Sequence, residues 1–243
     1  MRASGHDRDG LFATQPSYLL QERHISSRII AKIPAGLTKP QVTGQDVTVN
    51  AGTNSTLPGV GVLLAAGAGS RFTGPTHKLL APLGGRTVIE ASLASLLAAG
   101  FPTVIVVTGA VPIPPRILDH PGIVVVHNPE WAQGQATSIS VALRAAHDAG
   151  ARVAVVGLAD QPFVTPAAWR AVARTESPIA VATYDGERGN PVRLADDVWS
   201  LLPTTGDVGA RQVMRLRPEL VREVACEGSA ADIDTQEDLA PWT

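Results

Sequence analysis

The feature that most constrains this fold is a pattern that repeats from Pro58 onward: a short apolar run, a turn that contains glycine, and a helical segment. β-branched residues are common in the apolar runs, which are short enough for buried strands. The runs cover residues 59–66, 103–109, 122–128, 152–160 and 178–184. Because strands that alternate with helices form βαβ units, the pattern predicts an α/β fold with a doubly wound, mostly parallel sheet and helices on both faces.

The helical segments carry their own start and stop signals. Thr87 and Glu90 have the spacing of a capping box, and Thr165 followed by Pro166 is typical of a helix start. Aromatic residues make up 4% of the chain, so the core must be built from Ala, Val, Leu and Ile. The other expected elements are helices at 87–100, 137–150 and near 209–217, a turn at 185–190, a strand at 220–225, and a final short helix capped by Thr235 with Asp238 three residues on.

Charge, cysteine content and hydropathy exclude several classes of protein. The formal net charge is -2, whereas a surface for nucleic acid would be strongly basic. The single cysteine, Cys226, excludes an internal disulfide and multi-cysteine metal sites, and we expect it to be a small buried hydrophobe. No apolar run approaches the roughly 20 residues that span a bilayer, and the N-terminus lacks the pattern of a signal peptide. We therefore expect a soluble cytoplasmic protein without nucleic-acid or membrane partners.

Residues 1–57 differ from the rest of the chain. They are rich in Ser, Thr, Gly, Gln and Asn and show no sustained period apart from a weak helical pattern at residues 17–33. We expect an N-terminal extension that is partly disordered, or a misassigned translation start, followed by one folded domain at residues 58–243.

Ligands of doubly wound sheets bind beyond the carboxyl ends of the strands, so the loop after the first strand is a candidate site. This loop reads LAAGAGSRFTGPTHK over residues 64–78. A Rossmann fingerprint would start at Gly67 and Gly69, but Phe72 stands where its third glycine belongs. A Walker motif needs Lys and Ser/Thr directly after its second glycine, and proline follows Gly74. What remains is a loop of small residues whose backbone can approach a nucleotide.

Two cations lie in the same loop, Arg71 and Lys78. A guanidinium fork, an ammonium and backbone N–H donors together suit a triphosphate. Lys78 is also the only lysine after residue 57, in a domain that otherwise uses arginine. Arg71 has a second interpretation as a solvated surface arginine.

Carboxylates at the expected ligand edge predict a metal site. Asp160 ends the apolar run VAVVGLA, and Mg²⁺ in nucleotide sites usually takes one or two carboxylates together with phosphates and water. Asp232 and Asp234 alternate in an extended segment, so we expect one of them to be a direct ligand. The alternatives are a turn cap for Asp160 and helix N-terminal charges for the other two. Asp207 fits either a turn with a helix cap or an acceptor site.

Hydrolase chemistry finds no support in the sequence. The six histidines show no metal-ligand spacing, and none pairs with a plausible nucleophile. Ser138 and Ser140 lie in a predicted helix without a G-x-S-x-G elbow.

The motifs and their order resemble those of the MobA-like NTP transferases, within the nucleotide-diphosphosugar transferase fold. The segment LLAAGAGSRFTG…HKLLAPLGGRTVIEASL resembles the opening signature of that family. NPEWAQGQATSI (128–139), GNP (189–191), GDVGAR (206–211) and DIDTQEDL (232–239) resemble its later motifs in the right order, so the resemblance covers most of residues 60–239. Leu-Ala-Ala-Gly at 64–67 and Asp-Gln-Pro at 160–162 are typical of the molybdenum cofactor cytidylyltransferases, whereas the guanylyltransferases more often have Leu-Ala-Gly-Gly and Asp-Met-Pro.

The resemblance implies transfer of CMP from CTP to molybdopterin, with Mg²⁺ as cofactor, release of pyrophosphate and a molybdenum hydroxylase as a candidate partner. It also implies roles for individual residues. The implied catalytic residues are Arg71, Lys78 and Asp160. The implied metal ligands are Asp160 and Asp234, with Asp232 as the alternate to Asp234. Acceptor binding falls to Gln161, Asn190 and Asp207. The nucleotide would be bound by Leu64, Ala65, Ala66, Gly67, Gly69, Arg71, Lys78, Asn128, Gly134 and Ser138.

Departures from the family pattern leave the substrates open. The usual Arg-Met-Gly is one residue longer here, Arg-Phe-Thr-Gly at 71–74, Asn190 stands where the cytidylyl branch often has histidine, and Gln236 replaces a proline. The alternatives are the same chemistry with GTP or another phosphorylated acceptor, or recruitment as an oxidoreductase or as a cofactor-binding maturation factor for a molybdenum hydroxylase. The full set of Arg71, Lys78, Asp160 and Asp234 speaks against a purely binding role, but it does not exclude redox recruitment.

Overall fold

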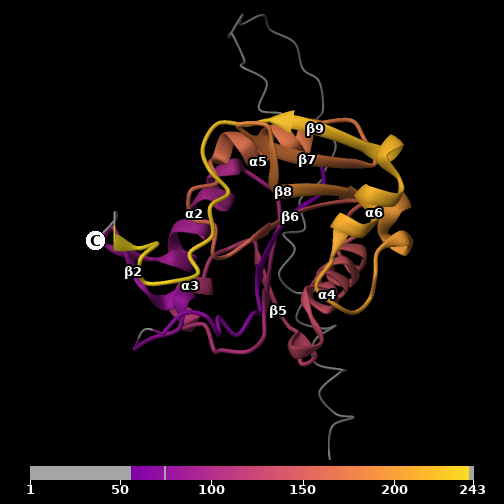
Figure 1. Ribbon diagram of the computed structural model, residues 1–243. Coiled ribbons are helices and arrows are strands. Elements are labelled where there is room, and N and C mark those ends of the chain that lie inside the picture. The colour runs from indigo at the N-terminus through magenta and orange to yellow at the C-terminus, as the bar shows by residue number, and fades with distance from the viewer. Residues whose placement is uncertain (1–55, 74, 241–243) are drawn as a thin grey trace, which may run out of the picture. The chain divides into compact units, whose positions relative to one another are not determined.

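The structure is a computed structural model that describes residues 56–73 and 75–240 (Figure 1). Most of the expected N-terminal extension, with its weak helical pattern at residues 17–33, lies outside the described residues, as does Gly74. Leu57 is described and is 4% exposed, within the apolar core of the domain that follows.

Seven strands form one sheet in the order β5-β4-β1-β6-β8-β7-β9. All neighbouring pairs are parallel except those of β8, which runs antiparallel to both β6 and β7. The strands are β1 (Val60–Ala65), β4 (Val104–Thr108), β5 (Ile123–His127), β6 (Val153–Leu158), β7 (Ile179–Tyr184), β8 (Glu187–Ala195) and β9 (Val221–Ala225). The predicted doubly wound, mostly parallel α/β sheet is confirmed.

The strand order reverses at β1, and this reversal positions the site. The chain moves outward from β1 to β4 and β5, and then returns to place β6 on the other side of β1. The helix that follows β1 and the helix that leads from β5 back to β6 therefore lie on opposite faces of the sheet, which leaves a crevice at the carboxyl ends of β1 and β6.

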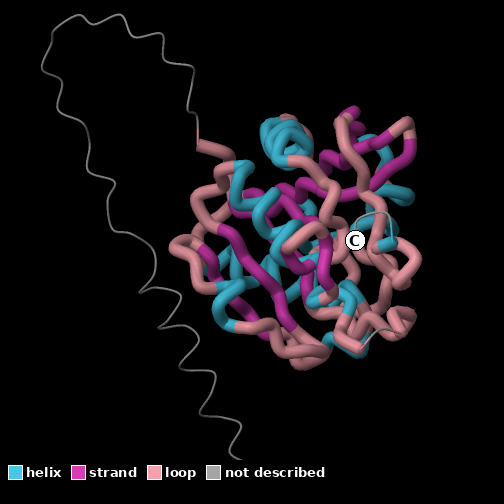
Figure 2. The backbone as a smooth tube through the Cα atoms, turned by 90° about the vertical axis from the view of Figure 1, so that its left-hand side faces the viewer, coloured by secondary structure: helices cyan, strands magenta, loops and turns pink. Residues whose placement is uncertain are grey.

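Helices cover both faces of the sheet, as Figures 1 and 2 show. Leu63 and Ala65 of β1 pack in one apolar cluster with α2 (Val88–Ala99), α3 (Pro115–Leu118) and α5 (Pro166–Arg174). Val62 and Leu64 point to the opposite face and pack with α4 (Gln135–Asp148) and α6 (Ala210–Leu216). This alternation is what a strand buried on both faces requires. Among the described residues, no helix is both long enough and apolar enough to cross a bilayer.

The helix starts predicted at Thr87 and Thr165 are confirmed. The Thr87 side chain accepts a hydrogen bond from the N–H of Glu90, and the Glu90 carboxylate accepts one from the N–H of Thr87, which completes a capping box. Gly100 ends this helix in the left-handed conformation, at φ 90°. Thr165 caps α5 through the N–H of Ala168, with Pro166 in the first position.

Two local predictions are wrong. The turn expected at residues 185–190 is shorter, because β8 begins at Glu187, and its polar first residues pair with β7 from Tyr184 to Ala182. The final helix expected after Thr235 is replaced by turns at residues 235–239. The Asp238 carboxylate accepts hydrogen bonds from the N–H groups of Asp234 and Thr235, but the described residues up to 240 form no α-helix here. In β8, pairing with β7 outweighs the local turn pattern, whereas the hydrogen bonds of residues 235–239 stay local.

The sequence analysis also missed several short elements. These are a two-stranded hairpin of β2 (Pro82–Leu83) and β3 (Arg86–Thr87), and the 3-10 helices η2 (Lys78–Leu80), η3 (Trp131–Gln133), η4 (Asp196–Leu201) and η5 (Pro218–Leu220). Cys226 is half-buried and packs against the cluster on the α2 face, close to the expected buried hydrophobe.

Candidate active site

The candidate site lies at the carboxyl ends of β1 and β6. Residues 66–73, which we name the glycine loop, follow β1, and Lys78 opens η2 a few residues later. Asp160 follows β6. The segment that carries Asp234 is attached beside Asp160, because the N–H of Ile233 donates to the Asp160 carbonyl at 2.9 Å and the Ile233 side chain is 1% exposed in the core. Three segments that are distant in sequence therefore meet at one edge of the sheet.

The ammonium of Lys78 lies between two carboxylates. Its Nζ is 2.6 Å from Oδ2 of Asp160 and 2.9 Å from Oδ1 of Asp234. Burial lowers the pKa of Lys78, but the combined attraction of Asp160 and Asp234 outweighs burial, so the pKa is raised above its ordinary value. Lys78 is therefore a protonated, largely enclosed cation at neutral pH.

Arg71 lies on the solvent side of Asp234 and forms a further ion pair with it. A guanidinium nitrogen of Arg71 lies 2.9 Å from Oδ2 of Asp234, and the arginine side chain is 76% exposed. Such a side chain can reorient at small energetic cost, because an exposed ion pair contributes little.

The same carboxylates fit a divalent cation. An oxygen of Asp160 and an oxygen of Asp234 converge on one positive charge, which is the donor arrangement that Mg²⁺ or Mn²⁺ takes. Among the described residues there is no group of three or more His, Cys, Asp or Glu that could hold a metal. The protein would therefore supply two ligands, and substrate phosphates and water would supply the others.

Asp232 faces other partners. Its Oδ1 accepts a hydrogen bond from Nε2 of Gln161 at 2.7 Å. Burial raises the pKa of Asp232, and the nearby charges of Asp160 and Asp234 raise it further. The expected alternation of Asp232 and Asp234 is thus observed, and it favours Asp234 as the second ligand.

The glycine loop presents unused backbone donors. Within the described residues, the N–H groups of Gly67, Gly69 and Ser70 donate no hydrogen bond. The carboxyl end of β1 is held on both sides, because the N–H of Ala159 donates to the Leu64 carbonyl and the N–H of Ala110 donates to the Ala66 carbonyl. Donors on a loop anchored in this way can bind phosphate oxygens without reorganisation.

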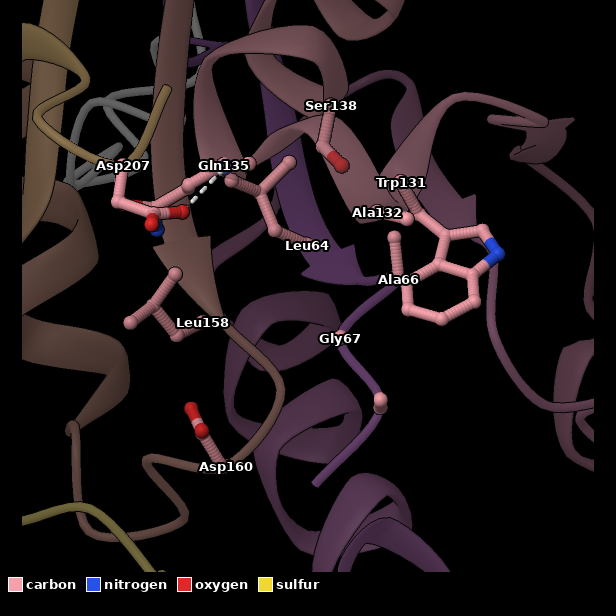
Figure 3. A pocket seen from close by; sticks show the side chains of 12 residues that line it. Leu64, Ala66, Gly67, Trp131, Ala132, Gln135, Ser138, Leu158, Asp160 and Asp207 are labelled. Carbon is pink, nitrogen blue, oxygen red and sulfur yellow. Dashed lines mark hydrogen bonds between the residues drawn. The ribbon is translucent and has the colours of Figure 1, made fainter. Parts of the chain in front are cut away.

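A cavity of about 330 Å³ opens beside the glycine loop (Figure 3). Leu64, Leu158 and Trp131 give it apolar walls, Asp160 lies toward one end, and Asp207 lies at the other. Ala66, Gly67, Gly134 and Ser138, all predicted to bind the nucleotide, also line it. The space is at the low end of the range for small-molecule sites.

Five predicted nucleotide-binding residues do not line the cavity. Gly69 and Arg71 belong to the glycine loop, and Lys78 lies between Asp160 and Asp234. Ala65 points to the opposite face of β1 and packs on the α2 face. Asn128 is fully buried, and its Nδ2 donates to Thr137 Oγ1 at 2.8 Å and to Ser138 Oγ at 2.9 Å. Asn128 therefore orients Ser138, which itself faces the cavity.

Asp207 belongs to a loop that closes over the start of α4. Its Oδ1 accepts a hydrogen bond from the N–H of Gln135 at 3.2 Å, as Figure 3 shows, and the Gly206 carbonyl accepts one from Ala136. Gly134 lets the two segments approach, since a Cβ at that position would lie 2.4 Å from the carbonyl carbon of Gly206. Asp207 therefore caps the start of α4 and not the helix α6 that follows it in the chain, and it lines the cavity. Its role in acceptor binding stays a prediction.

Gln161 and Asn190 form a buried network. Gln161 is 6% exposed, and its Nε2 donates to Asp232 and to the Ala230 carbonyl. Its Oε1 accepts a hydrogen bond from Nδ2 of Asn190. The backbone carbonyl of Asn190 in turn accepts one from the Tyr184 hydroxyl. The Gln161 amide is therefore fully engaged in positioning Asp232, and its role in acceptor binding stays a prediction.

The sequence analysis did not single out Trp131, Gln135, Leu158 or His77. Trp131 and Gln135 lie in the motif NPEWAQGQATSI, so the motif itself was the available signal. No sequence pattern marked Leu158 or His77 as site residues. The place of Leu158 depends on the order of the strands, and that of His77 depends on how the glycine loop folds.

Comparisons with known proteins agree with this geometry. Residues 61–224 match the MobA-like NTP transferase domain. Nicotine blue oxidoreductase of Paenarthrobacter nicotinovorans is 34% identical over 194 residues, which cover 74% of this chain and 93% of that protein. A nucleotidyl transferase from Methanothermobacter thermautotroptrophicus has a TM-score of 0.63 at 26% identity, over 75% of this chain and 94% of that one.

A third relative is Rv0371c from Mycobacterium tuberculosis H37Rv. Its crystal structure has a TM-score of 0.62 at 32% identity, over 76% of this chain and 97% of that one. Its complex with manganese has a TM-score of 0.59 at 30% identity, over 75% of this chain and 96% of that one. By sequence and by fold, the chain belongs to the family of MobA-like NTP transferase domain proteins.

Proposed function

We propose that this protein is a nucleotidyltransferase that uses a divalent metal and transfers a nucleoside monophosphate from an NTP to a phosphorylated acceptor. The observation that carries the proposal is the convergence of Asp160, Asp234 and Lys78, with Arg71 next to them. Two carboxylates and two cations at the end of a glycine loop suit a metal-bound triphosphate better than a neutral ligand.

Each group has a role in this chemistry. Asp160 and Asp234 would hold the metal, which supplies charge neutralisation across the phosphates. Lys78 and Arg71 would then turn from the carboxylates to the β- and γ-phosphates, where negative charge builds as pyrophosphate leaves. The free N–H groups of the glycine loop would bind phosphate oxygens, and the cavity beside Trp131 would take the nucleoside.

The reaction balances without a general base. An oxygen of the acceptor phosphate forms a bond to the α-phosphorus, and the bond from the α-phosphorus to the bridging oxygen of the β-phosphate breaks. An ionised phosphate is already nucleophilic, so the contribution of the protein is positioning and charge stabilisation.

The finer identity of the substrates rests on sequence. Leu-Ala-Ala-Gly at 64–67 and Asp-Gln-Pro at 160–162 favour CTP over GTP and molybdopterin as the acceptor. Mg²⁺ is the proposed metal, and the manganese complex of Rv0371c supports a divalent ion in this family. A molybdenum hydroxylase would then be the recipient of the product.

A second candidate function is a redox reaction. It is favoured by one observation, the 34% identity to a protein named nicotine blue oxidoreductase over 93% of its length. Under this candidate, the cavity would hold an organic electron acceptor and a nicotinamide cofactor would supply the hydride. The incomplete Rossmann fingerprint, with Phe72 in place of the third glycine, weighs against a conventional nicotinamide site.

One experiment separates the two candidates. Pyrophosphate release is measured with each of the four NTPs and Mg²⁺ or Mn²⁺, with and without molybdenum-loaded molybdopterin, and oxidation of NADH and NADPH is followed in parallel with a quinoid dye as acceptor. We expect release that requires the acceptor, favours CTP and is lost in Asp160→Asn but kept in Asp185→Asn, an exposed control. Dye reduction without pyrophosphate release would establish the redox function instead.

A further inference from the structure

The imidazole of His77 bridges the glycine loop and the turn that carries Lys78. Its Nδ1 lies 3.3 Å from the N–H nitrogen of Leu79 in η2, and its Nε2 lies 3.2 Å from the carbonyl oxygen of Gly67. A backbone N–H can only donate and a carbonyl oxygen can only accept, so Nδ1 must be unprotonated and Nε2 must carry the hydrogen. The network thus selects one neutral tautomer of His77.

The backbone of the glycine loop is shaped to fit this ring. Gly69 has φ +62°, and a Cβ at that position would lie 2.8 Å from Nε2 of His77 and 3.1 Å from Cγ of Lys78. The loop closes into a turn just beyond, where the N–H of Phe72 donates to the Gly69 carbonyl at 2.9 Å. The glycine therefore allows the loop to lie directly against the imidazole.

The two segments that His77 joins carry different parts of the proposed phosphate site. The glycine loop supplies backbone N–H donors, and η2 supplies the ammonium of Lys78. In the part of the chain that the structure describes, His77 is the side chain whose hydrogen bonds connect these two segments.

We propose that His77 is a positioning residue that, in its neutral Nε2–H form, latches the glycine loop to the Lys78 turn and so preorganises both for the nucleotide phosphates. The part of this proposal that concerns phosphates rests on the proposed nucleotidyltransferase function. The latch itself rests on the contacts alone.

The latch has a defined dependence on pH. Burial lowers the pKa of His77 below its ordinary value of 6.5; the carbonyls of Gly67 and Ala68 and the charge of Asp160 oppose this shift, and Lys78 adds to it. Lys78 on η2 and Asp160 after β6 are the charged groups that act on the ring, and residues 67–69 of the loop carry no charge. Neutral His77 therefore predominates at pH 7. As the pH falls through the lowered pKa, Nδ1 gains a proton and can no longer accept from Leu79, so the latch opens.

Three substitutions at His77 separate its two hydrogen bonds. His77→Asn keeps an acceptor near the position of Nδ1, and His77→Gln keeps a donor near the position of Nε2. His77→Phe keeps the ring volume and removes both bonds. His147→Asn and His147→Gln are matched controls, because His147 is exposed on α4.

The first test is independent of any activity. Long-range ¹H–¹⁵N NMR identifies the tautomer of His77, and amide hydrogen exchange measures the order of residues 67–72. We expect the Nε2–H tautomer in the wild type, faster exchange in the loop of His77→Phe, intermediate rates in the Asn and Gln variants, and no change in the His147 controls. An Nδ1–H tautomer, or unchanged loop exchange in His77→Phe, overturns the proposal.

The second test uses turnover with CTP and Mg²⁺, or with the NTP that the wild type prefers. Because each lost hydrogen bond weakens preorganisation modestly, we expect KM for the NTP to rise roughly tenfold in His77→Phe, less in His77→Asn and His77→Gln, and kcat to change little. Wild-type KM should also rise as the pH falls below the His77 pKa, whereas KM of His77→Phe should not respond to that titration.

Raised KM with unchanged loop exchange would mean direct contact between His77 and the nucleotide and would refute the latch. If the wild type uses no NTP, the proposed function fails, and the tautomer and exchange data still decide the latch.

Discussion

At the scale of single residues, Lys78 balances the negative charge of the candidate site. Its ammonium neutralises Asp160 and Asp234, and without it two carboxylates would face each other in a partly enclosed space. A divalent cation would meet the same two carboxylates. In the proposed function, Lys78 and the metal would compete for these carboxylates, and the nucleotide phosphates would give the ammonium another partner.

We predict opposite effects of Lys78→Met on metal binding and on turnover. Affinity for Mn²⁺ alone should rise, because the carboxylates lose their internal counterion. Pyrophosphate release should fall by about 100-fold or more, the usual effect of removing a group that stabilises transition-state charge. Isothermal titration with Mn²⁺ and a pyrophosphate assay measure the two quantities.

Arg144→Met is the control for this prediction, because Arg144 is exposed on α4, and neither quantity should change in it. An unchanged rate in Lys78→Met would remove Lys78 from the mechanism. Unchanged Mn²⁺ affinity would mean that Lys78 and the metal do not share their ligands.

At the scale of secondary-structure elements, α4 depends on a different kind of glycine at each end. Gly134 starts the helix at φ 106°, where a Cβ would meet the backbone of Gly206. Gly150 follows the helix at φ +72°, with open space around the Cβ position. Of the two, only Gly134 combines a positive φ with a close approach to another segment, the backbone of Gly206 beside the cavity.

The two glycines give a matched pair of substitutions. Gly150→Ala should cost about 1–2 kcal/mol of unfolding free energy, the strain of a left-handed residue with a side chain. Gly134→Ala should cost more, because the Asp207 loop must also move, and it should raise KM for the nucleotide. Urea unfolding and steady-state kinetics test this pair, and equal costs with equal KM values would show that the Gly134–Gly206 contact is unimportant.

At the scale of the whole molecule, the described residues form a complete sheet with an apolar cluster on each face. Both clusters draw their side chains from residues 57–239, including Leu57 at 4% exposure and Leu239 at 6%. We keep the proposal of one NTP transferase domain preceded by an extension. Among the described residues, Leu57 is the first that belongs to the core.

Deletion of residues 1–55 should therefore leave this domain folded. We expect a cooperative thermal transition within a few degrees of that of the full chain and unchanged pyrophosphate release, because the deletion removes none of the described core residues. Differential scanning calorimetry and the pyrophosphate assay on both forms are the measurements. A lost transition would show that the N-terminal segment is part of the folded domain.

Several features of this protein were determined by its sequence alone. The strand runs, the Thr87 capping box, the Thr165–Pro166 helix start and the chemistry of Arg71, Lys78, Asp160 and Asp234 are all predictable from it, because they depend on residues near one another or on the side chain itself. The glycine loop after the first strand is predictable for the same reason.

Other features were decided only by the tertiary structure. Lys78 meets Asp160 and Asp234 across 82 and 156 residues, and this contact depends on the strand order that places β6 beside β1. The polar start of β8 became a strand because β7 offered it backbone partners. The Gln161 amide was engaged by Asp232 and Asn190, and His77 was placed under the glycine loop. These outcomes depend on long-range backbone pairing and burial, whose free energy does not appear in any local pattern of residues.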